Sequence, residues 1–551
     1  MTDGDARARA GGALAVETLV SAGVDVVFGI HGAHVEAIFQ SCFDAGVRIV
    51  DTRHEAAAGH AAEGYARVGR RLGVAIATAG PGFTNIVTSM ANAAVDRTPV
   101  LYIVGAAQLD DPESNCLQSG IDQLAVAAPI VKWAHRVART ADVARLVAQA
   151  IRIATAAPTG PVYLEIPIDV MNGTADVPAF PAGRMADPAP AGVETIREIL
   201  RRLGEAARPL ILAGGPVYRG GGEGALRSLA ERLGIPVFAD FEALGALPCS
   251  NALFGGTLWQ LPRLDPENQP DLVLALGVRF GWDAPGFRAR LQPDIIHVEA
   301  DAAEIGRLGP VVLGVVADPA ATLVALCEAA DDESVKDRSE WATTIRRQRE
   351  ALRLAIRRSP IGEGIHPVVA ALAISDAVGS DAVVIADGAF TKHWLDDVVA
   401  PERSGSYITH GRLGAMGIGH GVAIGAQVAA PDRPIVVVTG DGSAGFNIAE
   451  FDTMVRHDLP ITVVIMNNKA WGASRVLQKV ESGRLVGTGL GNARYDQVMS
   501  AFGGDGYRVV ELSELDDTLR QAIASRRPAC VEIAISDEDE IPPAMLSAMT
   551  R

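Results

Sequence analysis

Short runs of apolar, often β-branched residues alternate with Ala-rich amphipathic segments along the whole chain, and this alternation most constrains the fold. Because strands with apolar residues on both faces are typical of parallel sheets covered by helices on both sides, the sequence predicts an α/β protein with doubly wound parallel sheets. The expected strands are "VDVVFG" (24–29), "GVAIATAG" (73–80), "PVLYIVG" (99–105), "PLILAGG" (209–215), "DLVLALG" (271–277), "DIIHVEA" (294–300), "DAVVIADG" (381–388), "PIVVVTGDG" (434–442) and "PITVVIMNN" (460–468).

The chain is too long for one hydrophobic core, with 551 residues of which 48% are hydrophobic. Two segments interrupt the alternation. Residues 172–192 are rich in Pro, Gly and Ala, and residues 331–366 combine a charged helical stretch with a Pro/Gly break. We therefore predict three domains, at 1–180, 190–340 and 360–551.

Composition argues against several classes of partner. The formal charge of −17 and the lack of a basic run disfavour nucleic acids and anionic membranes. The five cysteines are scattered without a CxxC pair, which indicates neither a disulfide framework nor a zinc site. The N-terminus has no signal-like pattern and no apolar run reaches about 18 residues, so we expect a soluble cytoplasmic protein.

Oxygen-bearing residues follow two of the expected strands. Strand 434–439 ends at "GDGS", which contains Asp441, and strand 461–467 ends at Asn467 and Asn468, with a helix-compatible segment between them. Parallel strands joined in this way end at the same edge of a sheet, where α/β proteins bind ligands. A carboxylate, an amide oxygen and close backbone amides suit Mg²⁺ and a diphosphate. A GDG alone is more often an ordinary turn, but the matching strand ends favour a diphosphate clamp.

The GDG followed by Asn-Asn resembles the thiamine diphosphate (ThDP) motif, and the whole chain resembles ThDP enzymes of the acetolactate synthase and pyruvate decarboxylase superfamily. The resemblance implies pyrimidine-binding, middle and diphosphate-binding domains, with Mg²⁺ held by Asp441, Asn468 and the backbone carbonyl of Ala470. Met416 would prop the cofactor in its bent form. The cofactor-binding residues that the resemblance implies are Thr78, Gly388, Ala389, Gly414, Met416, Gly440, Gly442, Ser443, Trp471 and Gly472.

Glu55 in "DTRHEAAAGHAAEGYARVG" matches the family glutamate that bonds the pyrimidine ring of the cofactor. Without the resemblance, it would be a helix first-turn Glu after the cap-like Asp51-Thr52, favoured by the helix dipole. We expect Ala56 to Gly59 to leave space for a close approach. In this superfamily the Glu and the GDG come from different subunits, which implies a homodimer as the minimal unit and a tetramer as the expected assembly.

Two further stretches, "VFGIHGAHVEAIFQSCFDAGVRIVDTRHEAAAGHAAEGYARVG" and "CLQSGIDQLAVAAPIVKWAHRV", resemble benzaldehyde lyases, which cleave and form 2-hydroxyketones. The resemblance implies that His34, beside His31, moves the proton of a substrate hydroxyl near neutral pH, and that Gln118 holds the substrate oxygen or a water. A lone histidine at a strand end is more often an ordinary hydrogen-bonded loop residue.

The expected substrate pocket departs from those lyases. Ile168, Lys392 and Leu477 stand where they have Trp, Tyr and Phe, and the loss of three aromatic faces removes stacking. We therefore expect aliphatic, small or charged aldehydes, or the corresponding 2-hydroxyketones. Lys392 could face an anionic group or lie solvated on the surface. The remaining pocket residues expected are Ala33, Leu117 and Ala415.

The resemblance leads us to predict a ThDP-dependent lyase and carboligase that cleaves and forms 2-hydroxyketones from aldehydes, and other functions stay open. The alternatives are a decarboxylating acetolactate synthase-like carboligase, a 2-hydroxyacyl-CoA lyase, and a catalytically silent ThDP-binding protein. Residues 212–234, "LAGGPVYRGGGEGALRSLAERLG", form a glycine-rich connection where FAD or ADP lies in some relatives. Because it lacks a clean GxGxxG pattern, we interpret it as a structural remnant.

Overall fold

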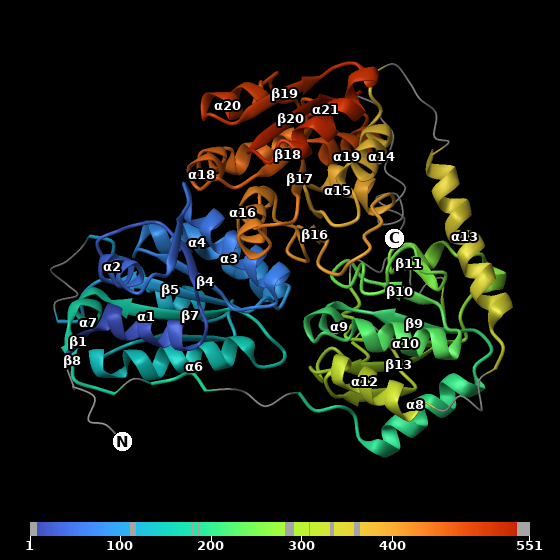
Figure 1. Ribbon diagram of the computed structural model, residues 1–551, viewed down its shortest axis with the longest axis horizontal. Helices are drawn as coiled ribbons and strands as arrows, with labels where there is room; N and C mark the ends of the chain where they lie inside the picture. The colour runs from blue at the N-terminus through green and yellow to red at the C-terminus, as the bar shows by residue number, and fades with distance from the viewer. Residues whose placement is uncertain are drawn as a thin grey trace.

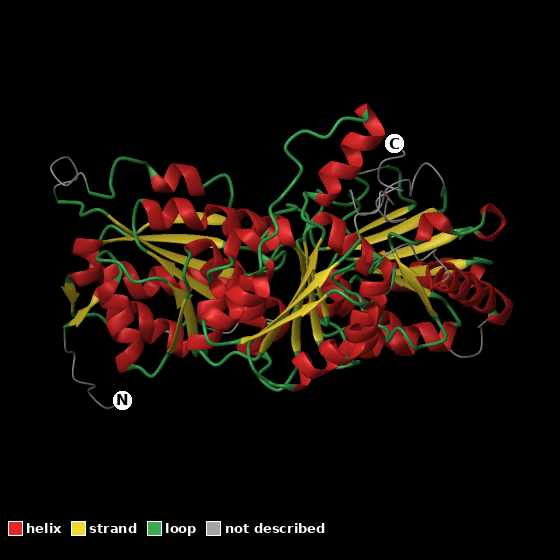
Figure 2. Ribbon diagram, turned by 90° about the horizontal axis from the view of Figure 1, so that it is seen from above, coloured by secondary structure: helices red, strands yellow, loops and turns green. Residues whose placement is uncertain are grey.

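The computed structural model describes residues 8–110, 117–178, 180–183, 188–281, 291–307, 309–330, 336–357 and 364–536. It contains three six-stranded sheets, one in each third of the chain, and every pairing within them is parallel (Figure 1). Helices cover both faces of the sheets (Figure 2). The predicted fold class is therefore confirmed.

The N-terminal sheet has the strand order β3-β2-β4-β5-β7-β6, and a short antiparallel pair, β1 and β8, lies beside it. The elements of this part are β1 (Arg9–Ala10), α1 (Gly11–Ser21), β2 (Val26–Gly29), α2 (Glu36–Asp44), β3 (Arg48–Asp51), α3 (Glu55–Gly69), β4 (Gly73–Ala77), α4 (Pro81–Val95), β5 (Val100–Ala106), α5 (Gln123–Ala127), β6 (Trp133–Arg136), α6 (Val143–Thr155), β7 (Val162–Pro167), α7 (Ile168–Asn172) and β8 (Thr174–Ala175).

The middle sheet has the order β11-β10-β9-β12-β13-β14. Its elements are α8 (Val193–Glu205), β9 (Pro209–Ala213), α9 (Gly215–Arg219), α10 (Glu223–Leu233), β10 (Val237–Ala239), β11 (Phe254–Thr257), β12 (Leu272–Leu276), β13 (Asp294–Glu299), β14 (Leu313–Val316), α12 (Pro319–Ala329) and α13 (Ser339–Arg357). The charged stretch expected to be helical is α13.

The C-terminal sheet has the order β16-β15-β17-β18-β20-β19. Its elements are α14 (Pro367–Val378), β15 (Val383–Asp387), α15 (Ala389–Asp396), β16 (Tyr407–Thr409), α16 (Gly419–Ala429), β17 (Ile435–Gly440), α17 (Asp441–Ala444), the 3₁₀ turn Gly445–Asn447, α18 (Glu450–Arg456), β18 (Ile461–Asn467), α19 (Gly472–Ser482), α20 (Tyr495–Ala501), β19 (Asp505–Val509), α21 (Leu512–Ala524) and β20 (Ala529–Ala534).

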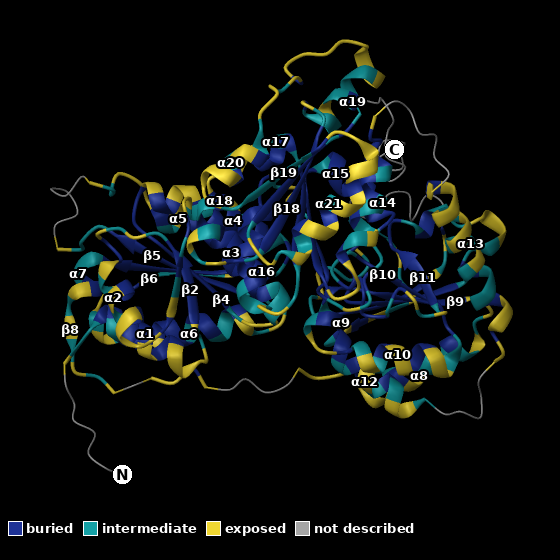
Figure 3. Cartoon of the chain, turned by 45° about the horizontal axis from the view of Figure 1, so that its top comes forward, coloured by how far each residue is buried: buried dark blue, intermediate teal, exposed yellow. Residues whose placement is uncertain are grey.

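All nine expected strands are present because each apolar run is buried on both faces of a sheet. Every residue of β4, β5, β12 and β18 is buried, and the strands form the dark core in Figure 3. Strands such as β3, β6 and β14 were not expected. They lie at sheet edges or contain exposed residues, so their sequences lack a continuous apolar run.

Helix α3 packs closely against α16, which joins the N-terminal and C-terminal domains through one hydrophobic core. A Cβ on Gly64 would lie 2.1 Å from the Val422 carbonyl oxygen, and one on Gly425 would lie 1.8 Å from that of Ala61. Only glycine permits this approach. The close approach expected along Ala56 to Gly59 is made at Gly59 by a neighbouring helix, because a Cβ there would lie 1.9 Å from the Ser89 hydroxyl oxygen of α4.

The three sheets fall within the predicted ranges 1–180, 190–340 and 360–551, and the domain boundaries themselves stay a prediction. The expected linker at 172–192 lies partly outside the described residues. Among the described helices, none combines the length and the apolar character needed to span a bilayer.

Candidate active site

A cavity of about 300 Å³ opens at the carboxyl edge of the C-terminal sheet. The chain runs from β15 to β16 on one side of β15 and then to β17 on its other side, so the point between β15 and β17 is where this fold class binds ligands. The cavity lies there. The predicted residues that line it are Gly388, Ala389, Met416, Gly440, Asp441, Gly442, Ser443, Asn468, Ala470, Trp471 and Gly472.

Asp441 has the character of a cation ligand. The register pairs Gly440 with Met466, which brings Asp441 beside Asn468. Asp441 is buried, and its Oδ2 has no hydrogen-bond partner among the described residues. Burial raises the pKa of Asp441 to about 6. A divalent cation would stabilise this carboxylate and lower its pKa, so the residues fit a metal ion.

A metal ion at Asp441 would need further ligands, and no cluster of carboxylates or imidazoles among the described residues is there to supply them. Within the described part of the chain, His, Cys, Asp and Glu nowhere gather in a group of three that could hold a metal. Asn468 and Ala470 line the same cavity as Asp441, and the Asn468 amide oxygen accepts the Ala470 N–H at 3.2 Å. Such a set needs further oxygens from a ligand, as Mg²⁺ bound to a diphosphate has.

Glycines allow the walls of the cavity to approach closely. Gly388 has a positive φ of 84°, and a Cβ there would lie 2.7 Å from the Ser443 hydroxyl oxygen. A Cβ on Gly442 would lie 2.5 Å from the Trp471 ring. Glycine at these two positions lets the turns pack against Ser443 and Trp471, which line the same cavity.

The sequence did not point to several residues of this cavity. Phe390, Thr391, Phe446 and Met466 also line it. Asp387 ends β15 directly before Gly388 and is completely buried. Burial raises the pKa of its carboxyl to about 6. The sequence feature that could have indicated Asp387 is its place as a charged residue at the end of an otherwise apolar strand.

A second group of predicted residues lies at the equivalent point of the N-terminal sheet, where the chain switches from β2 to β3 and then to β4. His34 follows β2 and Thr78 follows β4, and His34 Nδ1 lies 3.4 Å from Thr78 Oγ1. Burial lowers the pKa of His34, while a hydrogen bond with Gln118 raises it. Since burial is the larger effect, the imidazole is neutral near pH 7.

Glu55 begins α3 and belongs to the same part of the molecule. Its Oε2 accepts a hydrogen bond from Asn85 Nδ2 at 2.9 Å, a partner that the sequence did not indicate. The helix cap is His54, whose Nδ1 accepts the Ala56 N–H, and not Asp51-Thr52 as expected. His31 is exposed and faces Glu36 at 3.4 Å, so it does not join His34.

The two groups form separate half-sites. None of Glu55, His34, Gln118 and Thr78 lines the cavity around Asp441. The chain alone therefore does not bring the expected pyrimidine-binding and diphosphate-binding residues together. This separation agrees with a site completed by a second copy.

Lys392 was expected either in the substrate pocket or on the surface. It does not line the Asp441 cavity, and it is not a surface residue. It is completely buried, its ammonium pairs with Asp396, and it lies 4.1 Å from the centre of the Phe241 ring. Its charge is neutralised within the fold. The other residues expected in the substrate pocket or around the cofactor that do not line the Asp441 cavity are Ala33, Leu117, Ile168, Gly414, Ala415 and Leu477.

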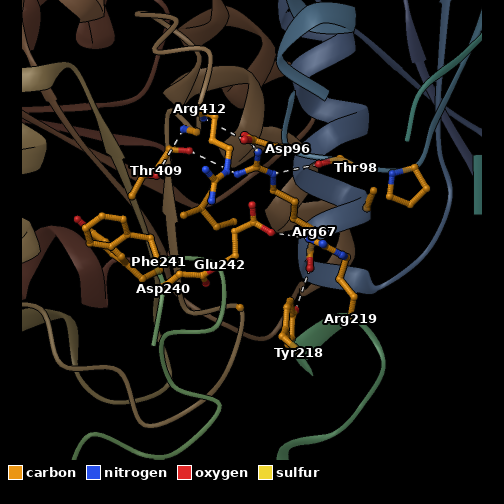
Figure 4. Close-up of a pocket in the computed structure, with 16 residues that line it drawn as sticks. Arg67, Asp96, Thr98, Tyr218, Arg219, Asp240, Phe241, Glu242, Thr409 and Arg412 are labelled. Carbon is orange, nitrogen blue, oxygen red and sulfur yellow. Dashed lines mark hydrogen bonds and ion pairs between the residues drawn. The ribbon is translucent and has the colours of Figure 1, made fainter. Parts of the chain in front are cut away.

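A smaller cavity of about 60 Å³ lies where the three domains meet, lined in part by Arg67, Asp96, Tyr218, Glu242 and Arg412 (Figure 4). The Asp96 carboxylate accepts the Arg412 backbone N–H and pairs with the Arg67 guanidinium. Figure 4 shows these side chains directed towards one another.

The glycine-rich connection beside this junction does not fit a dinucleotide. A Cβ on Gly215 would lie 2.1 Å from the Glu242 carboxylate, which pairs with Arg219. A Cβ on Gly214 would lie 2.1 Å from the Gly277 carbonyl oxygen. Protein atoms occupy the space that a phosphate would need, so these glycines serve packing.

The fold and the half-sites define a class of protein: an α/β enzyme that holds a diphosphate cofactor through Mg²⁺. Family models match most of the chain. They are described as thiamine pyrophosphate enzyme N-terminal TPP binding domain over residues 9–126, central domain over 196–326, and C-terminal TPP binding domain over 387–533. The chain belongs to the thiamine pyrophosphate enzymes.

Three relatives of the chain are acetolactate synthases. The chain is 32% identical over 530 residues to the acetolactate synthase large subunit IlvG of Mycobacterium tuberculosis, with 95% of each chain covered. It is 30% identical to the acetolactate synthase large subunit of Corynebacterium glutamicum, covering 97% of this chain and 88% of that one. It is 29% identical to the isozyme 1 large subunit of Escherichia coli, covering 96% and 94%. These relatives do not show the narrower resemblance to benzaldehyde lyases.

Proposed function

We propose that this enzyme is a carboligase that joins an acyl unit to the carbonyl carbon of a second substrate, with a 2-keto acid as the acyl donor and loss of CO₂. The observation that carries the proposal is the cavity in which Asp441, Asn468 and Ala470 meet the Gly388 and Gly442 turns. The similarity to acetolactate synthases over nearly the full chain supports the 2-keto acid donor.

The chain's own residues divide the work of holding the cofactor. Asp441, Asn468 and the Ala470 carbonyl would bind Mg²⁺, and the Gly388 and Gly442 turns would hold the diphosphate. Glu55 would donate or share a proton at the pyrimidine nitrogen. When bound, ThDP supplies the nucleophilic carbon of the reaction.

A second candidate, a 2-hydroxyketone lyase and carboligase, is supported by His34. Cleavage of a 2-hydroxyketone requires a base for the substrate hydroxyl. His34 is buried and neutral near pH 7, Thr78 faces its Nδ1, and Gln118 bonds the same side chain. His34 Nε2 would accept the hydroxyl proton, and Gln118 would hold the neighbouring oxygen.

A donor and acceptor screen separates the candidates. Pyruvate consumption with release of CO₂ would support the 2-keto acid donor. Cleavage of acetoin or benzoin to aldehydes without CO₂ would support the lyase, and a requirement for CoA would support a 2-hydroxyacyl-CoA lyase. The expected result is activity with pyruvate and an aldehyde or keto acid acceptor. Inactivity of the ThDP-loaded protein with every donor would contradict the carboligase.

Replacement of Glu55 by Gln tests catalysis against cofactor binding alone. Glu55→Gln removes one proton-sharing group and leaves the Asp441 clamp intact. We expect turnover to fall by at least about 10²-fold, since proton transfer contributes about that much, while ThDP still binds in titration calorimetry. Unchanged turnover would favour a silent ThDP-binding protein, and Asn85→Ala would show whether the Glu55 partner matters.

A further inference from the structure

Met416 reaches the cofactor cavity from a loop that has little packing of its own. The loop joins β16 to α16, and the Met416 side chain lines the cavity while 42% of its surface remains exposed. Gly414 and Gly417, on either side, have positive φ values of 71° and 79°. Because the side chain is not locked in a core, the backbone of the loop must determine where Met416 lies.

Side chains hydrogen-bond both the N–H and the carbonyl group of Gly417, the residue that follows Met416. Asp387 Oδ1 accepts the Gly417 N–H at 3.1 Å, and Asn447 Nδ2 donates to the Gly417 carbonyl at 2.7 Å. The second carboxylate oxygen of Asp387 accepts the Gly419 N–H at 3.0 Å. Two side chains therefore hold three backbone groups within three residues.

The two side chains do not line the cavity themselves, but each is next in the chain to a residue that does, Gly388 and Phe446. Asp387 ends β15, directly before Gly388, and Asn447 ends the 3₁₀ turn Gly445–Asn447 that follows α17, the helix begun by Asp441. Strand β15 pairs with β17, and Figure 1 shows α16 beside β17. The arrangement ties the Met416 loop to the turn that lines the cavity and to the segment after the metal ligand.

The backbone at Gly417 and Gly419 is also closely packed against its neighbours. A Cβ on Gly419 would lie 3.0 Å from Asp387 Cβ, and one on Gly417 would lie 2.3 Å from Phe446 Cβ. Asp387 has no exposed surface, and a buried carboxylate without such donors would be strongly destabilising. The hydrogen bonds from the Gly417 and Gly419 amides therefore stabilise the buried Asp387 carboxylate.

We propose that Asp387 and Asn447 are positioning residues that hold the Gly417 peptide and thereby set the place of Met416 in the cofactor cavity. The proposal rests on the proposed function only in identifying the occupant of the cavity as ThDP. The hold on the loop itself is a property of the protein without cofactor.

Hydrogen exchange of the cofactor-free protein tests the hold directly. The amides of Gly417 and Gly419 are expected to be protected in the wild type. Asp387→Asn keeps the shape but turns an N–H₂ group towards one of the two amides, so exchange at these amides should accelerate about tenfold or more, the equivalent of one hydrogen bond to a charged group. Asn447→Ala should accelerate it by a few fold.

Gln427→Ala is a matched control. Gln427 Nε2 donates to the Pro431 carbonyl at 3.1 Å at the opposite end of the same helix, α16, so the variant loses an amide-to-carbonyl bond away from the cavity. Exchange at Gly417 and Gly419 should stay at the wild-type rate. Equal acceleration in all three variants, or in none, would overturn the proposal.

ThDP affinity, measured by titration calorimetry, tests whether the hold acts through Met416. Asp387→Asn should weaken ThDP binding about tenfold in the wild-type background, and by much less in a Met416→Ala background, because coupled residues are not additive. An equal loss in both backgrounds would indicate general destabilisation and contradict the positioning role. A wild type that binds no ThDP would defeat the proposed function, whereas the exchange result would still decide the hold.

Discussion

At the scale of single residues, burial determines the chemistry that each candidate can perform. Asp441 and His34 are both buried, and burial disfavours the charged form of each: the pKa of Asp441 is raised and that of His34 is lowered. A raised carboxyl pKa suits a group that needs a cation, and a lowered imidazole pKa suits a base. Lys392 is equally buried, but its ion pair with Asp396 makes it structural.

His34→Ala is expected to reduce cleavage of 2-hydroxyketones by about 10²-fold or more, since a general base contributes about that much. ThDP affinity should change little. Because the neutral imidazole is the active form and its pKa is lowered, wild-type activity should persist below pH 6.5 and fall only as the pH drops through that lowered pKa. Steady-state rates across pH provide the measurement.

The exposed His31→Ala is the control for this variant and should leave the rate near that of the wild type. Equal losses of ThDP affinity and rate in His34→Ala would assign His34 to packing.

At the scale of elements, α16 and α18 connect the half-sites to the core. Helix α16 packs against α3, which begins at Glu55, and α18 holds the turn before Glu55, where both oxygens of Glu450 accept the Arg53 N–H at 3.1 and 3.2 Å. The two helices carry buried polar residues, His420 and Glu450, whose burial has measurable consequences.

His420 on α16 is completely buried, and neither ring nitrogen has a hydrogen-bond partner among the described residues. Leaving such groups unpaired costs about 1–3 kcal/mol. His420→Phe, which keeps an aromatic ring against Phe451, should raise the unfolding temperature by about 2 °C or more. The control His297→Phe removes a bonded imidazole, with Nε2 2.9 Å from the Val278 carbonyl, and should lower it. Destabilisation by both substitutions would show that His420 is satisfied.

Glu450 on α18 should make stability depend on pH. Burial raises the pKa of Glu450 to about 7, above its usual value of 4.5. A group with a raised folded-state pKa contributes stability at low pH that is lost as the pH rises through the folded pKa. The free energy of unfolding should therefore fall by about 2 kcal/mol between about pH 5.5 and about pH 7.5 because of this group.

Glu450→Gln removes this dependence, so the difference in melting temperature between wild type and variant should be larger at the lower pH. Thermal melts of the cofactor-free proteins provide the comparison. A difference that is constant with pH would rule out ionisation of Glu450 as the cause.

At the scale of the whole molecule, two incomplete half-sites carry exposed apolar side chains. Leu117 is 72% exposed beside Gln118, and Phe446 is 57% exposed at the Asp441 cavity. Single exposed apolar residues are ordinary on protein surfaces, so the separation of the two half-sites carries the argument for assembly. We propose that a second copy covers both half-sites, with Glu55 of one chain meeting Asp441 of the other.

Co-expression of Glu55→Gln and Asp441→Ala chains tests this arrangement. Each variant alone should be inactive. In a random mixture half of the dimers are hybrids with one intact site of two, so about a quarter of wild-type activity should return. If both residues acted within one chain, mixing would restore nothing. Mixed Glu55→Gln chains carrying two different tags serve as the control.

Local signals in the sequence were sufficient for the fold class, all nine expected strands and the meeting of Asp441 with Asn468. Apolar runs and the residues that end them follow from backbone periodicity and from the parallel rule, which hold wherever the strand lies. These properties need no knowledge of distant partners.

Tertiary structure alone decided what each small or charged residue faces. Gly59 and Gly64 could have faced a ligand or a helix, and only the packing of α4 and α16 shows that they face helices. Asp387 could have been a strand-end charge in water, and only the return of the loop at Gly417 makes it a buried acceptor. These outcomes depend on contacts between segments far apart in the chain, which no local pattern encodes.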